Sequence, residues 1–532
     1  MNYFEFIIFN DDDNNINSWV SIGYLSSILQ KKVNIKPRIN FYTSEDINNV
    51  VKKICKDPPL AIGLPLLQHN FDTVINFAQM VKKKLPDVFI VLGNKEATRY
   101  YNFIFENYNC IDGIILGEGE DTLSDLCTRL INKLPLVGCD GLYVKTEDGL
   151  IKNKPRILEQ NIDKFPFPDR SYRIGNSNRY NLIGSRGCVG NCTYCEANSI
   201  YTYNSGYHVR MRSIKNILDE IESILKKHTF IFVTFLDSTF CSFNHNSLER
   251  LEELYTGLKK RNLDIHFSIN IRSEQVNKQF VDCLVKLKEV GLVSILIGIE
   301  SGNKEDLDLY GKTATLDIHE KAIKLLNKNN IINGKNDIIF EYGFINFNPY
   351  TTLDKLKKNL NFIDKNNLLC YPYDLLSRLR ISGNAAITKR IHNDGLLLQD
   401  INVPIKDPYA YRFKNNHITE LYKILERSFN ILNVTYFQNI IGQYLRYQKF
   451  FPEKKLFVDI NNVHEYNKYI THISKIIFNN AIKLSLNEIN EKELLETSYF
   501  YKNKLKRYVD KLQVISNRLS IDLHKIKQLA HF

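Results

Sequence analysis

Short apolar runs alternate with amphipathic segments along the first 150 residues. Runs of about four to eight apolar residues are typical of buried strands, whereas apolar residues spaced by three and four positions indicate a helix. Residues 71–84 show the helical spacing, because Val74, Ala78 and Val81 fall on one side. This alternation predicts a parallel, doubly wound sheet with helices on its faces. The expected strands are Tyr3–Phe9, Leu60–Leu64, Val88–Leu92 and Gly113–Leu116.

Two further segments follow these strands. Residues 141–153 are predicted to form a β-hairpin closed around the turn signal Asp148-Gly149. The stretch 154–179 contains the proline-bearing sequence DKFPFPD, so we expect a linker there.

Strand and helix signals alternate again from about residue 180. Six strand–helix units predict a parallel barrel or part of one, with its active site at the carboxyl ends of the strands. The expected strands are Asn181–Gly184, Phe230–Leu236, Asp264–Ile269, Val293–Ile299, Ile338–Ile345 and Asp374–Ile381. Helices are expected at about 213–228, 247–261, 274–290, 315–329 and 352–367. Beyond about residue 400 strand signals fade, and long stretches such as 471–532 are predicted to be helical.

Composition narrows the class of protein. A chain of 532 residues with 44% hydrophobic and 24% charged residues is globular, and its length suggests several domains. Lys and Arg exceed Asp and Glu by 71 to 59, and residues 401–532 hold 21 basic against 12 acidic residues. An acidic peptide or a nucleic acid would fit this excess, as would a solvated surface without a partner. Because no basic strip interleaved with aromatic residues is present, nucleic acid is not the favoured partner.

The sequence also bears on location. No apolar run approaches the roughly 18 residues that cross a bilayer. The start, MNYFEFIIFNDDD, lacks the basic region of a signal peptide. Ten cysteines in a chain of this length suggest thiols or metal ligands rather than a disulfide framework. We therefore expect a cytoplasmic protein without a membrane segment.

Three cysteines form the sharpest motif of the chain. Cys188, Cys192 and Cys195 lie within eight residues, directly after the first strand expected beyond residue 180. Gly187 and Gly190 permit tight turns that let the sulfurs converge. Three thiolates suit a soft metal centre, and a four-iron cluster with only three protein ligands leaves one iron open to a small molecule. Tyr194 offers an aromatic face beside that position.

A zinc site is the main alternative for these thiols. It would need a distant fourth ligand, and zinc more often uses CxxC pairs on separate hairpins. The iron–sulfur interpretation is therefore favoured.

The CxxxCxxC motif after the first strand of a (βα)6 domain resembles the radical S-adenosylmethionine (SAM) superfamily. Further segments resemble the subgroup whose radical SAM domain follows a cobalamin-binding-like domain, and together they cover roughly residues 55–395. These segments are LGEGEDTLSDL (116–126), VRMRSIKNILDEIESI (209–224), FLDSTF (235–240), IRSEQVN (271–277), GIESGNKEDLDLYGKTAT (298–315) and GFINFNPYTTLDKLKKNL (343–360). The resemblance implies a [4Fe-4S] cluster whose open iron binds SAM, and reductive cleavage of SAM to a 5′-deoxyadenosyl radical by an external electron donor.

The resemblance also assigns roles to individual residues. The expected cluster ligands are Cys188, Cys192 and Cys195. Asp237, Ser238 and Thr239 fall where the family contacts the methionine end of SAM. Arg272 would meet the SAM carboxylate and Glu300 the ribose hydroxyls, pairings that suit a guanidinium and a carboxylate.

The resemblance implies four segments in an α/β architecture. They are a Rossmann-like, cobalamin-binding-like domain (1–153), a linker (154–179), a radical SAM core with a partial (βα)6 TIM-type barrel (180–395) and a helical C-terminal domain (396–532). The Asp-x-His-x-x-Gly motif that supplies a histidine to cobalt is absent, and His69 in LLQHNFD does not match it. Cobalamin binding is possible without a protein ligand, but a retained scaffold without cobalamin is the narrowly favoured interpretation.

The reaction is harder to predict. Some relatives modify ribosomally made peptides, so a peptide is the expected substrate, with L-to-D epimerisation narrowly favoured. Such inversion needs a hydrogen donor, and the candidates are Cys370 and Cys241, with Tyr371 and Tyr373 as weaker alternatives. The alternatives are a cobalamin-dependent C-methyltransferase, a tRNA-modifying enzyme and a non-catalytic iron–sulfur sensor. The sequence does not predict an oligomeric state.

Overall fold

A computed structural model describes residues 3–10, 19–147, 149–173, 178–198, 201, 204, 209–241, 247–329, 338–383, 385–432 and 460–504. By its internal contacts the chain forms two compact units, each built from separate stretches of sequence. The first unit comprises residues 1–296, 310–313 and 380–410, and the second comprises residues 297–309, 314–379 and 411–532. The three expected domains and their linker stay a prediction, because the two units are defined by internal contacts and not by independent folding.

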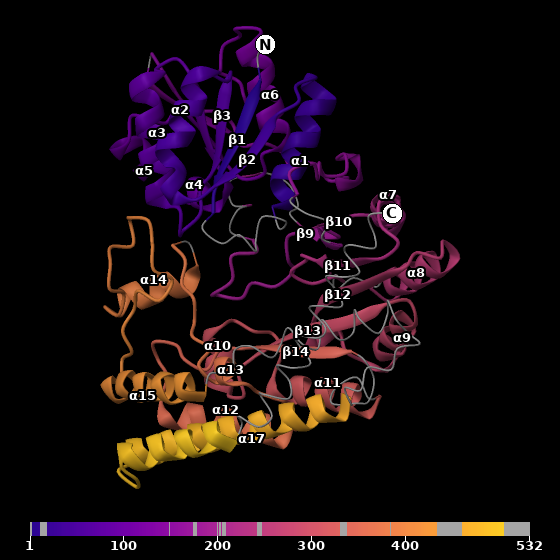
Figure 1. Cartoon of the computed structure of the whole chain (residues 1–532), viewed down its shortest axis with the longest axis vertical. Coiled ribbons are helices and arrows are strands. Elements are labelled where there is room, and N and C mark those ends of the chain that lie inside the picture. Colours follow the sequence, from indigo (N-terminus) through magenta and orange to yellow (C-terminus); the bar gives the residue numbers. More distant parts are fainter. Residues whose placement is uncertain are drawn as a thin grey trace. The chain divides into compact units, whose positions relative to one another are not determined.

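The N-terminal part of the first unit is a seven-stranded sheet in the order β2-β1-β3-β4-β5-β6-β7 (Figure 1). Its parallel strands are β1 (Phe4–Phe9), β2 (Arg38–Tyr42), β3 (Ala61–Pro65), β4 (Phe89–Gly93) and β5 (Gly113–Ile115). The antiparallel hairpin β6 (Leu142–Thr146) and β7 (Gly149–Lys152) continues the sheet from β5, so the predicted hairpin is confirmed. Asp148, the expected turn residue, lies outside the described residues.

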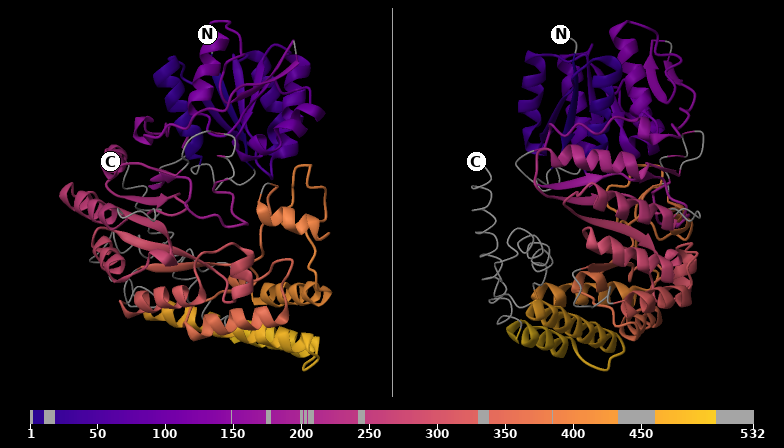
Figure 2. Two further views of the ribbon diagram at one scale, coloured as in Figure 1. Left: turned by 180° about the vertical axis from the view of Figure 1, so that it is seen from behind. Right: turned by 90° about the vertical axis from the view of Figure 1, so that its right-hand side faces the viewer.

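Helices cover both faces of this sheet, and Figure 2 shows them from two further sides. Alternate residues of β1 explain the two layers, because Ile7 and Phe9 pack into one apolar core and Phe4 and Phe6 into the other. Helices α2 (Ile47–Lys56), α3 (Phe71–Lys84) and α5 (Tyr101–Asn107) contribute to the first core. Helices α1 (Val20–Ile28) and α6 (Glu120–Ile131) contribute to the second, while the short α4 (Asn94–Arg99) follows β4.

The second sheet has five strands in the order β14-β13-β12-β11-β8. They are β8 (Arg179–Leu182), β11 (Ile231–Phe235), β12 (Ile265–Arg272), β13 (Leu292–Glu300) and β14 (Ile339–Phe344). The intervening helices are α7 (Ile214–Leu225), α8 (Ser247–Lys260), α9 (Lys278–Glu289), α10 (Lys304–Leu309), α11 (Leu316–Lys328) and α12 (Leu353–Lys365). Within this sheet each strand lies beside the next of its members along the chain, as in part of a parallel barrel, while β9 (Ser185–Arg186) and β10 (Arg210–Met211) pair in a separate two-stranded sheet. The predicted α/β architecture with a partial barrel is therefore confirmed.

The sixth expected strand, Asp374–Ile381, is wrong. Residues Pro372–Leu375 form the short helix α13, and only an isolated bridge from Phe347 to Arg378 represents strand pairing there. Pro372 occupies the first turn, where a missing N–H costs nothing, and Asp374 accepts the backbone N–H of Tyr371 at 2.8 Å. Local capping therefore favours a helical turn over an extended strand.

Among the described residues beyond about 400 helices dominate, as the sequence predicts, while residues 505–532 of the expected helical stretch 471–532 lie outside the described residues. Helix α14 (Ala386–Asn393) lies in the first unit, and α15 (Asn416–Leu432) and α17 (Ile460–Ser485) pack together in the second. Within the first unit, the Tyr100 hydroxyl accepts the backbone N–H of Ile405 at 3.1 Å, and Lys406 pairs with Asp72 at 2.8 Å. In the part of the chain that is described, no helix is both long and apolar enough to span a membrane.

Candidate functional site

The three cysteines of the CxxxCxxC motif lie in one loop that follows β8 and the short strand β9 (Ser185–Arg186). Cys188 is buried, Cys192 is half-buried and Cys195 is exposed. Within the described ranges, no three His, Cys, Asp or Glu side chains lie close enough together to hold a metal ion. The loop therefore carries all three thiols, but their sulfurs do not converge on one point.

Backbone amides in this loop donate to two of the sulfurs. The N–H of Gly190 donates to Cys188 Sγ at 3.4 Å, and the N–H of Ala197 donates to Cys195 Sγ at 3.4 Å. Such bonds stabilise negative charge on sulfur, which is the form that binds metal. The thiols and their amide donors fit an iron–sulfur cluster held by three protein ligands.

Asn198 makes three hydrogen bonds to the backbone of this loop, and no motif in the sequence marks it as a site residue. Its Oδ1 accepts the backbone N–H of Cys188 at 2.8 Å, and its Nδ2 donates to the carbonyl oxygens of Cys188 and Gly190 at 2.8 and 3.0 Å. One side chain thus fixes three backbone groups around the first cysteine.

Arg272 lies against the cysteine loop, as the expected role beside the cluster requires. A Cβ added to Gly190 would lie 2.3 Å from Arg272 Nη1, so only glycine allows this approach. The guanidinium donates to Glu274 at 2.5 Å and to Thr313 at 3.1 Å. Burial alone would lower the pKa of Arg272, but Glu274 and the thiol groups of Cys192 and Cys188 raise it overall.

Glu274 is a residue that the sequence did not single out. Burial alone would raise the pKa of its carboxyl, but hydrogen bonds from Arg272 and Thr313 lower that pKa to about 2. Arg272 therefore stays cationic and Glu274 anionic, and the pair holds the guanidinium beside the thiols, where its Nη1 lies next to Gly190.

Asp237, Ser238 and Thr239 follow β11 and differ in burial and in hydrogen-bond partners. Asp237 is buried and accepts the backbone N–H of Gly184 at 2.9 Å, and burial raises the pKa of its carboxyl to about 6. Thr239 is also buried and donates to Gln275 at 3.2 Å. Ser238 is exposed and lines a cavity described below. Of the three, Ser238 has the side chain that is free to meet a ligand.

Tyr194, the aromatic residue of the motif, packs its ring edge-on against Tyr310 at a centroid distance of 5.4 Å. The backbone N–H of Thr193 donates to the carbonyl of Tyr310 at 2.9 Å. The segment 310–313 therefore supports the middle of the cysteine motif.

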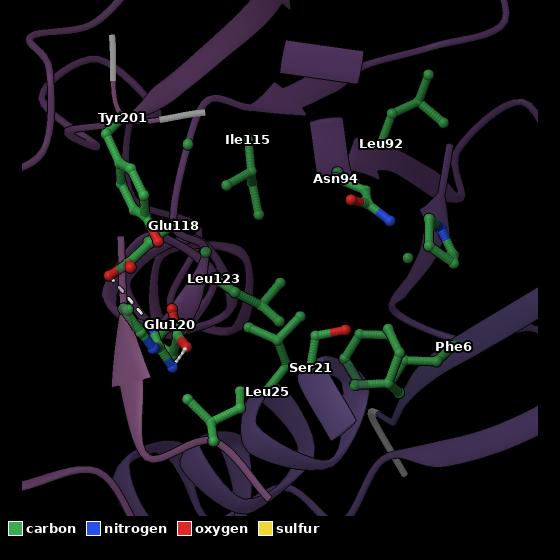
Figure 3. A pocket seen from close by; sticks show the side chains of 18 of the residues that line it. Phe6, Ser21, Leu25, Leu92, Asn94, Ile115, Glu118, Glu120, Leu123 and Tyr201 are labelled. Carbon is green, nitrogen blue, oxygen red and sulfur yellow. Dashed lines mark hydrogen bonds and ion pairs between the residues drawn. The ribbon is translucent and has the colours of Figure 1, made fainter. Parts of the chain in front are cut away.

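A cavity of about 340 Å³ lies inside the first unit (Figure 3). One face of the seven-stranded sheet, α1 and the start of α6 line it, together with Ser185–Gly187 and Ser238 from around the cysteine loop. Figure 3 shows Glu118, Glu120 and Tyr201 gathered on one side. The labelled apolar side chains are Phe6, Leu25, Leu92, Ile115 and Leu123.

Four charged side chains join the N-terminal sheet to the cysteine loop beside this cavity. Glu118 pairs with Arg186 at 3.1 Å and with Arg210 at 2.6 Å, and Glu120 pairs with Arg186 at 2.5 Å. Burial alone would raise the pKa of Glu118, but Arg186 and Arg210 lower it overall. Glu118 and Glu120 therefore hold Arg186, which lies two positions before Cys188.

Glu300 belongs to the second unit, at the end of β13. Its φ of 71° is left-handed, a conformation that costs energy in a residue with a side chain. The carboxylate lies beside Gly343, whose added Cβ would be 3.3 Å from it. The strained backbone and the carboxylate at a strand end are compatible with the expected ribose contact.

The two candidate hydrogen donors are both fully buried. Cys241, in the first unit, donates to the Ser247 carbonyl at 3.8 Å, and burial raises the pKa of its thiol to about 12. Cys370, in the second unit, precedes α13, and its backbone N–H donates to Thr471 at 3.1 Å. Burial also raises its thiol pKa to about 12. Neither residue lines the cavity of Figure 3.

Comparison with known families identifies the second sheet. Residues 182–349 match the family described as the radical SAM superfamily. A protein of Pyrococcus horikoshii, the uncharacterized methyltransferase PH0819, is 26% identical over 318 residues, which are 58% of this chain and 66% of that protein. The chain spans from half to just under two thirds of the length of the first curated relatives that it matches.

Two solved structures share the fold over most of the chain. The cobalamin-dependent S-adenosylmethionine radical enzyme OxsB with aqua-cobalamin bound has a TM-score of 0.71 and 19% identity, over 99% of this chain and 81% of that one. The radical S-adenosylmethionine methyltransferase TsrM from Kitasatospora setae, with cobalamin and a [4Fe-4S] cluster bound, has a TM-score of 0.57 and 15% identity. That match covers 74% of this chain and 78% of TsrM.

Proposed function

The chain is an enzyme of the radical SAM superfamily, in the subgroup with an N-terminal cobalamin-binding-like domain, and we propose that it transfers a methyl group with the help of cobalamin. The observation that carries this proposal is the cavity between one face of the N-terminal sheet and the cysteine loop, all within one compact unit. The acceptor would be a carbon of an organic substrate.

The cysteine loop would hold the cluster through Cys188, Cys192 and Cys195. A bound cluster would supply, through an external electron donor, the electron that cleaves SAM. Arg272 would bind the SAM carboxylate, because Glu274 orients its guanidinium and Gly190 leaves room for it. Ser238 would donate a hydrogen bond to a polar group of SAM, whereas the role of Glu300, in the second unit, at the ribose hydroxyls stays a prediction.

The cavity of Figure 3 favours cobalamin binding, in contrast to the scaffold interpretation of the sequence. Apolar side chains such as Leu25 and Leu123 line the cavity beside the polar Glu118 and Glu120. Such a lining suits a large amphipathic cofactor. Among the described residues His69 does not line this cavity, and the absence of a histidine ligand to cobalt stays a prediction. The relatives OxsB and TsrM were solved with cobalamin bound, which supports the same proposal.

Peptide epimerisation gains no support from the comparisons. The named relatives are methyltransferases, a cobalamin-dependent radical enzyme, cyclases and a synthase. The peptide substrate and the hydrogen-donor roles of Cys241 and Cys370 stay predictions.

A second candidate is a cobalamin-dependent radical SAM reaction without methyl transfer. It is favoured by the coverage of the OxsB match, which extends over nearly the whole chain whereas the TsrM match covers three quarters.

The two candidates differ in what happens to SAM. The protein would be purified without oxygen, reconstituted with iron, sulfide and cobalamin, and given SAM with a one-electron reductant. S-adenosylhomocysteine and methylcobalamin are expected if the enzyme transfers methyl groups, whereas 5′-deoxyadenosine alone would favour the second candidate. A protein that binds cobalamin only as weakly as an unrelated control protein would contradict both candidates. The Cys192→Ala variant serves as the cluster-deficient control.

A further inference from the structure

A second cavity of about 340 Å³ lies within the first unit, on the side of the cysteine motif that carries Tyr194. It is formed by the loop after β3, the start of α4, the motif residues Tyr194 and Glu196, and residues 380–382. Because Tyr194 sits between the second and third cysteines, whatever occupies this cavity lies beside the cluster loop. The mechanism above does not use this cavity.

Two buried polar atoms in the lining have no partner. Gln68 Nε2 and Ser382 Oγ make no hydrogen bond to any described residue, and Ser382 is only 8% exposed. A buried donor without an acceptor destabilises the folded protein. Two such atoms in one cavity indicate that a ligand with acceptor atoms satisfies them.

The charges around the cavity leave cations in excess. Arg99, which is almost fully buried, pairs with both carboxylates of the lining, Glu96 at 2.6 Å and Glu196. Lys95 approaches Glu196 only to 3.6 Å, at the limit of an ion pair. Arg380 is exposed, and its guanidinium forms no ion pair within the described ranges. Three cations, Lys95, Arg99 and Arg380, thus face two carboxylates, which leaves one net positive charge at the cavity.

We propose that this cavity binds an anionic group of the substrate, a carboxylate or a phosphate, through Arg380, Lys95, Ser382 and Gln68. An anion accepts hydrogen bonds from all four side chains, and guanidinium groups match the geometry of carboxylate and phosphate. The negative charges of Glu96 and Glu196 are balanced by Arg99 and Lys95 together, so they do not repel the anion strongly, and Arg380 adds one net positive charge. That the anion belongs to the substrate rests on the proposed function, but the binding itself does not.

The test measures anion binding by the reduced protein in the absence of SAM and cobalamin. Inorganic phosphate and malonate would be titrated separately by calorimetry, at an ionic strength held constant with sodium chloride. Saturable binding of at least one is expected, and it should weaken at least tenfold in Arg380→Gln and several-fold in Ser382→Ala. The matched control is Arg38→Gln, because Arg38 is also surface-exposed and pairs only with Asp57 at 2.8 Å. Binding of phosphate alone would identify a phosphorylated substrate, and binding of malonate alone a carboxylic acid.

Three outcomes would overturn this assignment. They are no saturable binding of either anion, equal affinity in wild type and Arg380→Gln, and displacement of the anion by SAM, which would make the cavity part of the SAM site. If SAM is not cleaved but Arg380-dependent binding remains, the proposed function fails and the anion site stands. If SAM is cleaved but Arg380→Gln binds the anion as wild type does, the proposed function stands and the anion site fails.

Discussion

The Arg186 guanidinium donates to the carboxylate of Glu120 at 2.5 Å. Arg186 lies two residues before the first cysteine of the motif, and Glu120 is the first residue of α6 on the N-terminal sheet. Both side chains line the cavity of Figure 3. A ligand in that cavity would therefore touch the ion pair that positions the cysteine loop, and cobalamin binding and cluster assembly should be coupled.

Glu118→Ala should destabilise the protein. The substitution leaves the buried Arg210 without its carboxylate and removes one of the two acidic partners of Arg186. Loss of one member of a buried ion pair typically costs about 3–5 kcal/mol. Urea unfolding of the cluster-free protein would measure the change. Asp219→Ala, which removes exposed ion pairs with Lys215 and Arg261, should cost less than about 1 kcal/mol, and equal losses in the two variants would contradict the argument.

Asn198→Ala should weaken cluster retention. It removes three hydrogen bonds around Cys188, each of which contributes about 1 kcal/mol. Iron and sulfide per chain after reconstitution should fall, and loss of iron to a chelator should be several times faster. Asn132→Ala, at the exposed end of α6, is the matched control. Chelation rates that match wild type would show that the loop does not depend on this side chain.

Gly93→Phe should block the cavity of Figure 3 and leave the fold intact. Gly93 lines the cavity, and an added Cβ would meet nothing within 4 Å. A phenyl group would fill space meant for cobalamin, so we expect at least tenfold weaker cobalamin retention after gel filtration. SAM cleavage to 5′-deoxyadenosine should continue. Leu150→Phe, on the exposed strand β7, should retain cobalamin, and unchanged retention in Gly93→Phe would place cobalamin elsewhere.

Asp237→Asn should change how stability depends on pH. Burial raises the pKa of Asp237 to about 6, above the unfolded value of about 3.9. The folded state therefore binds more protons between about pH 4 and 6, and wild-type stability falls across that window as pH rises. Asparagine keeps the acceptor for the Gly184 N–H but carries no charge, so the variant should gain stability relative to wild type up to about pH 6.

Urea midpoints of the cluster-free protein at several pH values would test this difference. Asp219→Asn should instead lose stability relative to wild type, because a hydrogen bond from Lys215 lowers the pKa of Asp219. Its loss of stability relative to wild type should grow as pH rises through the acid range. If the Asp237→Asn and wild-type curves run parallel, the carboxyl is not titrating in the folded protein as proposed.

Cys370→Ala and Cys241→Ala should leave product formation unchanged. Both thiols are buried, and each variant should lose only about 1–2 kcal/mol of stability through a small cavity. Product mass spectrometry in heavy water would show deuterium at carbon only if a protein thiol returns hydrogen. Deuterium uptake that disappears in one of these variants would restore the hydrogen-donor role and contradict methyl transfer as the sole outcome.

The sequence predicted the elements whose burial is complete. Strands such as β3 and β4 are continuous apolar runs, because both faces of a parallel sheet are covered. Strand β2 was missed, because it lies at the sheet edge and its residues RINFY are half-buried or exposed. The strand expected at Asp374–Ile381 failed for a different reason, since the Pro372 and Asp374 caps act locally and outweigh apolar content.

The site was predictable where chemistry demands a residue type at a fixed spacing. The three cysteines and Arg272 fall together in the first unit for that reason. Asn198, Glu274 and the ion pairs of Glu118 carry no motif of their own, because their roles depend on contacts between residues distant in sequence. The cavities depend on the same long-range packing, so neither could be read from the chain alone.

The return of residues 380–410 to the first unit affects the order of events during synthesis. Tyr100 accepts a hydrogen bond from Ile405, and Asp72 pairs with Lys406. Both partners are translated more than 300 residues later. The ribosome must therefore release most of the polypeptide before the oldest part of the nascent chain acquires all of its neighbours. A protein truncated after residue 379 contains both sheets but lacks part of the first unit. It should therefore be bound by chaperones and degraded by proteases more readily than the full chain.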